Sequence, residues 1–129
     1  MSKLDLTLEV IPGKLAIVRL SPSVREMPGW AVNGFVSACL LTPEETTIVC
    51  SEGVVPAGET AELSWRALRV RGVLEFELVG VLSRLASILA AANVSIFALS
   101  TFSTDYILVK DFMLVTAIQA LRTAGYSVI

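Results

Sequence analysis

The stretch Ser95–Lys110, with the sequence SIFALSTFSTDYILVK, decides the fold because it predicts two β-strands joined by a short polar turn. Apolar residues stand on both sides of the polar Ser/Thr/Asp turn, which is typical of two strands joined in a hairpin. The flanking segments, Gly80–Asn93 and Lys110–Gly125, instead repeat their apolar residues every three or four positions, as amphipathic helices do. The hairpin is therefore predicted to be the centre of an alternating α/β unit.

The second half of the chain predicts a complete unit of six elements. They are a strand over Ser64–Arg71, a helix that Gly80 opens and Asn93 ends, strands over Val94–Phe102 and Thr104–Val109, a helix capped by Asp111 and ended by Gly125, and a strand over Tyr126–Ile129. The segment 73–79 fits a strand or a loop. The order βαββαβ predicts an α+β fold of the ferredoxin-like kind, with four antiparallel strands and two helices on one face.

The first half predicts a shortened copy of this unit. Val36–Glu52 aligns without a gap on Ser95–Asp111, from position 36 to position 95, a spacing of 59 residues, and Thr42 falls opposite Thr101. After Glu52 the chain continues as GVVPAGETAE, which predicts a loop where the second helix of the unit would stand. We expect a shortened unit over residues 1–61 and a complete unit over residues 62–129.

Composition excludes several classes of function. Of the 129 residues, 54% are hydrophobic, an excess that two joined units or a dimer interface would bury. The longest apolar stretches are too short to predict a membrane span, and Asp5 and Glu9 argue against a secretory leader, so a cytoplasmic location is expected. A net charge of -2 argues against nucleic-acid and membrane partners. The absence of histidine removes histidine-based metal sites and Ser-His triads, and no metal or cofactor is expected.

Cys39 and Cys50 are the two cysteines of the chain. A hairpin centred between Glu44 and Glu45 would place them directly opposite each other, as a redox pair. The alternative is two buried, reduced thiols that behave as small apolar side chains. Two cysteines alone do not complete a tetrahedral thiolate site.

The elements around Gly80-Val81-Leu82 and the Ser-Thr turn resemble the ACT domain family. Over Trp65–Ile129, the segments WRALRV, LVGVLSRLASILAAANVSIF and ALSTFSTDYILVK are similar to small bacterial tandem-ACT proteins related to CASTOR-type arginine sensors. They are also similar to the regulatory ACT pairs of aspartate kinases. The resemblance implies a non-catalytic, regulatory module that binds a small amino acid between two ACT units, with a homodimer or higher homo-oligomer as the expected assembly.

The resemblance also implies the residues of the ligand site. Backbone groups of Gly80, Val81 and Leu82 would hold the carboxylate or ammonium of the ligand, because glycine permits close approach and a helix N-terminus favours an anion. The side chains expected to contact the ligand are Thr101, Phe102 and Asp105. In the arginine-sensor relatives an acidic residue at the Asp105 position meets a cationic side chain. The run Glu77–Gly80 departs from the family's common Asp-x-Pro-Gly loop by lacking the proline.

Each of these positions also has a structural interpretation. Asp105 and Thr101 could stabilise the turn, Phe102 could be a packing residue, and Gly80 could be present for chain geometry alone. Arg66, Arg69 and Arg71 fit an exposed, ion-paired face beside Glu75 and Glu77, or else an anion site.

Three other functions can be weighed against amino-acid binding. A structural or protein-interaction module without a ligand would use the same surfaces. An acylphosphatase-like enzyme needs an arginine in the loop before Gly80, which this sequence lacks. An RNA-recognition domain needs a basic surface around its aromatic residues.

Overall fold

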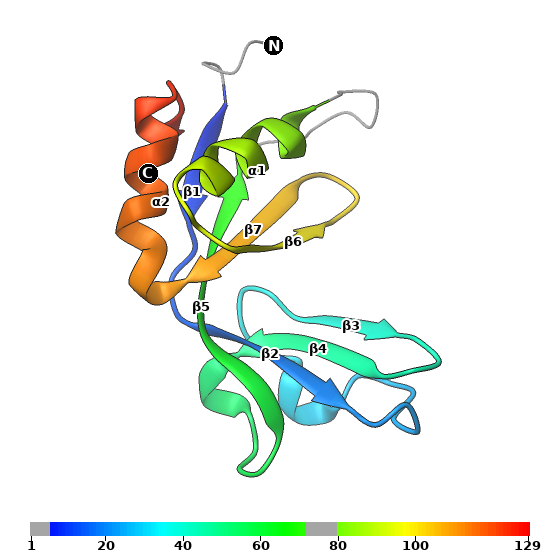
Figure 1. Ribbon diagram of the computed structural model, residues 1–129. Coiled ribbons are helices and arrows are strands. Elements are labelled where there is room, and N and C mark those ends of the chain that lie inside the picture. Colours follow the sequence, from blue (N-terminus) through cyan, green and yellow to red (C-terminus); the bar gives the residue numbers. More distant parts are fainter. Residues whose placement is uncertain (1–5, 72–79) are drawn as a thin grey trace. The chain divides into compact units, whose positions relative to one another are not determined.

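The computed structural model describes residues 6–71 and 80–129, which form two compact units (Figure 1). Unit 1 contains the chain up to Ile11 and again from Arg66 onward, and unit 2 contains Pro12–Trp65. Unit 2 is thus an insertion within unit 1. The expected division into residues 1–61 and 62–129 differs from the division into these compact units, because the first strand of the chain belongs with the second half.

Unit 1 has the predicted βαββαβ order with one additional strand. Its elements are β1 (Thr7–Val10), the end of β5 (Thr60–Val70), α1 (Val81–Ala91), β6 (Ile96–Ser100), β7 (Asp105–Lys110), α2 (Leu114–Thr123) and β8 (Ser127–Val128). The strand path is β6-β7-β5-β1-β8. β1 lies between β5 and β8, pairing antiparallel with the former and parallel with the latter. The α+β, ferredoxin-like fold class is confirmed, but the expected sheet of four antiparallel strands is corrected by this inserted strand.

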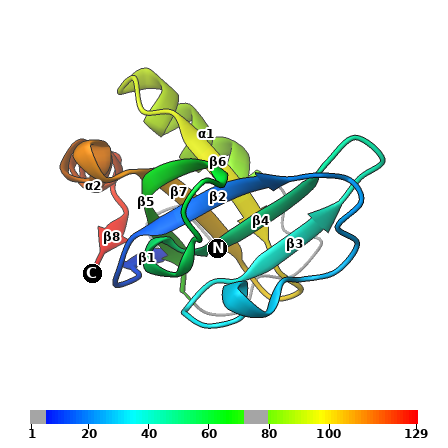
Figure 2. The same cartoon turned by 90° about the horizontal axis from the view of Figure 1, so that it is seen from below.

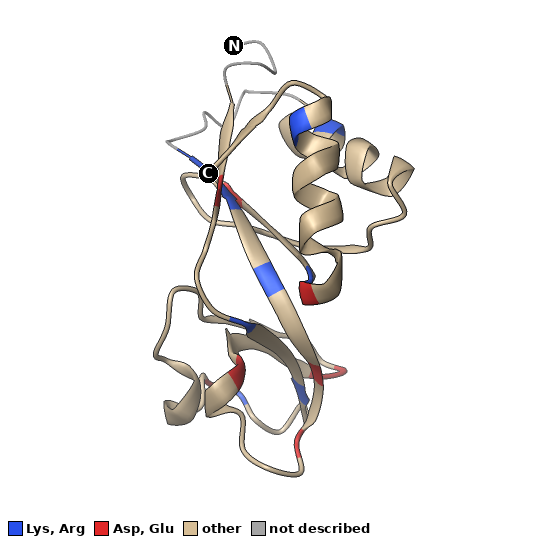
Figure 3. Ribbon diagram, turned by 90° about the vertical axis from the view of Figure 1, so that its left-hand side faces the viewer, with Lys and Arg blue, Asp and Glu red and all other residues tan. Residues whose placement is uncertain are grey.

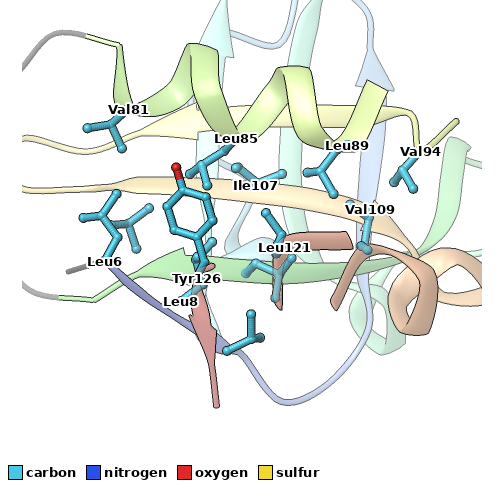
Figure 4. Close-up of a cluster of buried hydrophobic side chains, with 14 residues drawn as sticks. Leu6, Leu8, Val81, Leu85, Leu89, Val94, Ile107, Val109, Leu121 and Tyr126 are labelled. Carbon is cyan, nitrogen blue, oxygen red and sulfur yellow. The ribbon is translucent and has the colours of Figure 1, made fainter. Parts of the chain in front are cut away.

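The helices of unit 1 pack on one face of its sheet (Figure 4). The apolar positions predicted for the first helix either lie in this core or pack against it, because a period of three and four residues places them on one side of α1. Alternate residues of the strands complete the cluster, whose fully buried members include Leu8, Leu68, Leu85, Ile107 and Leu121. The strand residues between them therefore point to the opposite face.

The helix ends follow the predicted glycine and asparagine signals, but not the predicted cap. Asn93 follows α1 with φ +61° and Gly125 follows α2 with φ +101°, the left-handed conformation that ends many helices. Asp111 was predicted to cap the second helix, and this is wrong. It begins a 3₁₀ turn, η4 (Asp111–Met113), and its carboxylate instead pairs with Arg66 at 3.3 Å.

Unit 2 repeats the element order of unit 1 with 3₁₀ turns in place of helices. Its elements are β2 (Leu15–Leu20), η2 (Gly29–Ala31), β3 (Ala38–Leu41), β4 (Thr46–Ser51), η3 (Glu52–Val54) and the start of β5. Its path β3-β4-β2-β5 matches β6-β7-β5-β8 in unit 1, apart from the inserted β1 (Figure 2). β4 and η3 lie 59 residues before β7 and η4 at both of their ends. The first half is thus a shortened copy, as the sequence predicts.

A bulge in β5 lies just before the residue where the chain leaves unit 2. Leu15 pairs with Trp65 but Ile17 pairs with Glu62, so β5 has one extra residue, and Ser64 adopts φ +63°. The carboxylate of Glu52 accepts the Ser64 backbone N–H at 2.6 Å. This bond satisfies a donor that the bulge removes from the regular ladder.

The cysteines do not face each other as predicted. The hairpin pairs Ala38 with Val49, so Cys39 lies opposite Ile48, two residues away from the expected partner Cys50. Cys50 instead pairs with Ala16 of β2, and both thiols are free. Cys50 is buried in the core of unit 2, and its burial raises the pKa of the thiol. It therefore behaves as a small apolar side chain.

Over residues 6–71 and 80–129, no helix has the length and apolar character that crossing a membrane requires. The same residues contain no cluster of cysteine and carboxylate side chains suited to hold a metal ion.

Candidate functional site

The topology of unit 1 brings the two predicted site segments to the same end of the unit. A short connection joins the end of α1 to β6, so the helix and the strand run in opposite directions. The start of α1 therefore lies at the same end as the turn between β6 and β7 (Figure 1). Gly80, Val81 and Leu82 come from the first segment, and Thr101, Phe102 and Asp105 come from the second.

The start of α1 presents backbone donors without a side-chain cap. Gly80 precedes the helix in the left-handed conformation, with φ +87°. Because glycine has no side chain, it cannot accept a hydrogen bond from the first turn as a Ser or Asp cap would. Its carbonyl accepts the Arg84 N–H at 2.9 Å. Val81 is buried and Leu82 is half-buried against the core, so packing fixes both residues. As the first residues of α1, they place their backbone N–H groups at the positive end of the helix dipole.

Arg84 adds a cation to this helix start, a residue that the sequence interpretation missed. A Cβ atom built on Gly80 would lie 3.0 Å from Nη1 of Arg84, so the guanidinium folds back over the glycine. Its Nε is buried and has no hydrogen-bond partner among the described residues. A cation is unfavourable at a helix N-terminus. The available signal was an arginine one helical turn after the opening glycine.

The turn between β6 and β7 is held by its own hydrogen bonds. The Thr101 N–H donates to the Thr104 carbonyl at 2.8 Å, and Thr101 Oγ1 accepts the N–H groups of Ser103 and Thr104. Ser100 Oγ donates to Asp105 Oδ1 at 2.7 Å, across the last pair of the hairpin. These bonds explain why Ser, Thr and Asp occur here, and Thr101 and Asp105 have a structural role whatever else they contact.

Phe102 lies at the tip of this turn with 83% of its surface exposed. It is therefore not buried within its own unit, as the packing interpretation would require. Exposed aromatic side chains of this size often contact ligands or other protein surfaces.

A family comparison matches this part of the chain. Residues 60–123, from the start of β5 to the end of α2, match the model of the ACT domain. Residues 60–123 belong to the ACT domain family. The match includes both predicted site segments. Among curated proteins, none matches the sequence.

Solved structures are similar to nearly the whole chain, beyond the matched residues. The protein Atu0741 of Agobacterium tumefaciens is 28% identical, with a TM-score of 0.89 over 96% of this chain and 92% of that one. A Vibrio cholerae protein of unknown function, described as a possible transport protein, is 20% identical, with a TM-score of 0.70 over 95% and 91%. The ligand-free regulatory subunit of aspartate kinase from Thermus thermophilus is 11% identical, with a TM-score of 0.57 over 94% and 95%.

The family match confirms the predicted resemblance to ACT domains. The chain also shares the fold of an aspartate kinase regulatory subunit. The narrower resemblance to arginine sensors stays a prediction.

Proposed function

We propose that this ACT domain protein is a non-catalytic regulatory module that binds a small amino acid at the start of α1, at an interface between ACT units. The family match and the fold shared with a regulatory subunit of aspartate kinase support the regulatory part. The assembly that fits is a homodimer or higher homo-oligomer, since the exposed Phe102 can then be covered by a second copy.

The observation that carries the proposal is the uncapped start of α1 with the Arg84 guanidinium folded over it. Both groups donate hydrogen bonds and both carry positive charge, so together they favour an anion. The carboxylate shared by all amino acids has this chemistry. Gly80 is suited to the position because a Cβ there would crowd the guanidinium and strain the backbone.

The β6–β7 turn would then supply discrimination between side chains. In this proposal Asp105 keeps its bond to Ser100 through Oδ1 and offers its second oxygen to a cationic or hydroxyl group of the ligand. Thr101 and Phe102 contact the rest of the side chain. Which amino acid binds follows from these three residues and from the partner surface.

A thermal-shift screen of the purified protein against the twenty amino acids tests the proposal. A ligand at 100 times its Kd stabilises the folded state by about 2.7 kcal/mol, which raises Tm by several degrees. The shift is expected to vanish in Arg84→Gln and to persist in Arg19→Gln, a matched change at an exposed arginine of β2. If no amino acid shifts Tm at millimolar concentration, the binding proposal fails.

The alternative function is a structural or protein-interaction module without a small-molecule ligand. The exposed aromatic side chains of unit 1 favour it, with Phe102 at 83% and Phe112 at 80% exposure. Under this alternative, Phe102→Ser changes the oligomeric state in sedimentation while the amino-acid screen stays negative. A positive screen that Arg84→Gln abolishes would exclude it.

A further inference from the structure

The sheet face of unit 1 that points away from the helices contains a second polar cleft. Leu8, Leu68 and Val70 face the helices, so the residues next to them on β1 and β5 point the other way. There β1, β5 and the β6–β7 turn enclose an open cleft of about 550 Å³. Its polar lining includes Glu9, Arg69, Arg71, Ser103, Thr104 and Tyr106.

The floor of the cleft is a fixed chain of three side chains. Arg69 donates from Nε to Glu9 Oε1 at 2.7 Å, and its Nη2 donates to the same oxygen. Its Nη1 donates to the hydroxyl oxygen of Tyr106 at 3.5 Å. The bonds to Tyr106 and to Glu9 raise the pKa of Arg69, so it stays charged. The Tyr106 oxygen already accepts a bond, and its own O–H is left to donate.

The turn forms one wall and is attached to the end of β5. Thr104 Oγ1 donates to the Val70 carbonyl at 2.6 Å, which fixes the turn beside the residue that precedes Arg71. Ser103 comes directly before Thr104 in the turn and lines the cleft. Its hydroxyl has no hydrogen bond within residues 6–71 and 80–129. The hydroxyls of Ser103 and Tyr106 are therefore both available as donors.

Arg71 gives the cleft its net charge. It is the first residue after β5 and lines the same cleft as Arg69, it is exposed, and its guanidinium has no ion pair with any described residue. Arg69 is neutralised by Glu9, so the three charged side chains sum to one positive charge, on Arg71. Charges of both signs lie side by side along this part of the sheet (Figure 3). The remaining cation has five donors and a wall of hydroxyl donors beside it.

We propose that this cleft binds a small oxyanion, such as the carboxylate of a metabolite or inorganic phosphate, through Arg71 with the hydroxyls of Tyr106 and Ser103. One planar guanidinium group can donate two parallel hydrogen bonds to two oxygens of a carboxylate or phosphate, and flanking O–H donors add to this binding. The Arg69–Glu9 pair positions Tyr106 and keeps the floor neutral. This site is separate from the start of α1 and does not depend on amino-acid binding there, although both use the β6–β7 turn.

Titration of the 15N-labelled protein with succinate and with inorganic phosphate, followed by NMR, tests the proposal. Chemical-shift changes are expected at the amides of Val70, Arg71, Ser103 and Thr104. Arg71→Gln is expected to weaken binding at least about tenfold and Tyr106→Phe severalfold, because each removes a donor to a charged acceptor. Arg19→Gln, the exposed arginine on β2, is expected to leave the affinity unchanged.

The relative affinity for succinate and phosphate identifies the source of the oxyanion. The proposal is overturned if neither probe gives saturable chemical-shift changes up to about 20 mM, a concentration on the order of the weakest dissociation constant expected for a single exposed guanidinium. Binding that Arg71→Gln leaves intact also overturns it, as do shifts confined to residues 80–84. The last result would place anion binding at the helix start and support the proposed function alone, whereas a negative amino-acid screen with shifts at Arg71 would support the cleft alone.

Discussion

Replacing Tyr126 by phenylalanine should stabilise the protein, which is the reverse of most core substitutions. Tyr126 is 3% exposed, and its hydroxyl oxygen lies in the core beneath α1, between Val81 and Leu85 (Figure 4). That hydroxyl has no hydrogen-bond partner among the described residues. The unfolded chain hydrates the same group, so folding loses hydrogen bonds to water and gains none in return.

The expected size of the effect follows from this loss. A buried, unsatisfied hydroxyl costs about 1–3 kcal/mol, and phenylalanine keeps the ring in place while removing only the oxygen. We therefore expect Tyr126→Phe to raise the free energy of unfolding by about 1 kcal/mol. In a chain of this length that corresponds to an increase in Tm of roughly 3–6 °C.

Urea unfolding measures the difference in the free energy of unfolding between Tyr126→Phe and the original protein, provided that both have the same m-value. Tyr106→Phe is the control. Tyr106 is also a tyrosine of unit 1, but its hydroxyl accepts a bond from Arg69, so its removal should lower stability or leave it unchanged. A loss of more than about 0.5 kcal/mol in Tyr126→Phe would refute the reasoning, because it would mean that the hydroxyl makes a hydrogen bond in the folded protein.

Three further substitutions test the packing, the backbone and the pH dependence. Leu85→Ala, at a fully buried position of α1, should lower the free energy of urea unfolding by about 2–5 kcal/mol, whereas Leu40→Ala, 63% exposed, should change it by less than about 0.5. Gly34→Ala should destabilise by about 1–3 kcal/mol, since Gly34 has φ +121° and the new Cβ would lie 2.2 Å from Ser51 Oγ; adding Ser51→Ala should recover only the clash, and full recovery would argue against backbone strain. Burial raises the pKa of Cys50, so its stabilising contribution is complete below the unfolded-state pKa of about 8.5 and is lost as pH rises toward the folded-state pKa. Cys50→Ala should remove a slope of at most about 1.4 kcal/mol per pH unit between pH 8.5 and 9.5, and equal slopes in both proteins would contradict this assignment.

The parts of the fold that local patterns determine were predictable from the sequence. The helix of Val81–Ala91 has a regular apolar period, the hairpin of Ile96–Lys110 has a polar turn between apolar strands, and the 59-residue repeat is reproduced at both ends of β4 and β7. Features that depend on distant partners were not. The pairing of β1 with β5 and β8 leaves no local mark, because Thr7–Val10 would have the same pattern in either unit.

Small local errors had equally physical causes. The centre of the hairpin lies one residue earlier than expected, which moved Cys39 opposite Ile48 in place of Cys50, since the register of adjacent strands depends on the turn that joins them. Asp111 was predicted as a cap from its position alone, but Arg66 lies close enough to pair with it. Arg84 was missed at the candidate site because its fold over Gly80 depends on the conformation of the glycine, which composition does not show.

The insertion of unit 2 between β1 and β5 has a consequence for how the chain folds. Thr7 and Ser127 are neighbours across β1 and β8 although 120 positions separate them, whereas Ala16 and Cys50 in unit 2 are 34 positions apart. Contacts between distant residues form late because closing a long loop costs entropy. Unit 2 also pairs Leu15 near its beginning with Trp65 at its end, so its early folding shortens the loop that separates β1 from β5. A defect in the core of unit 2 should then slow the folding of unit 1, even though none of the altered atoms belongs to that unit.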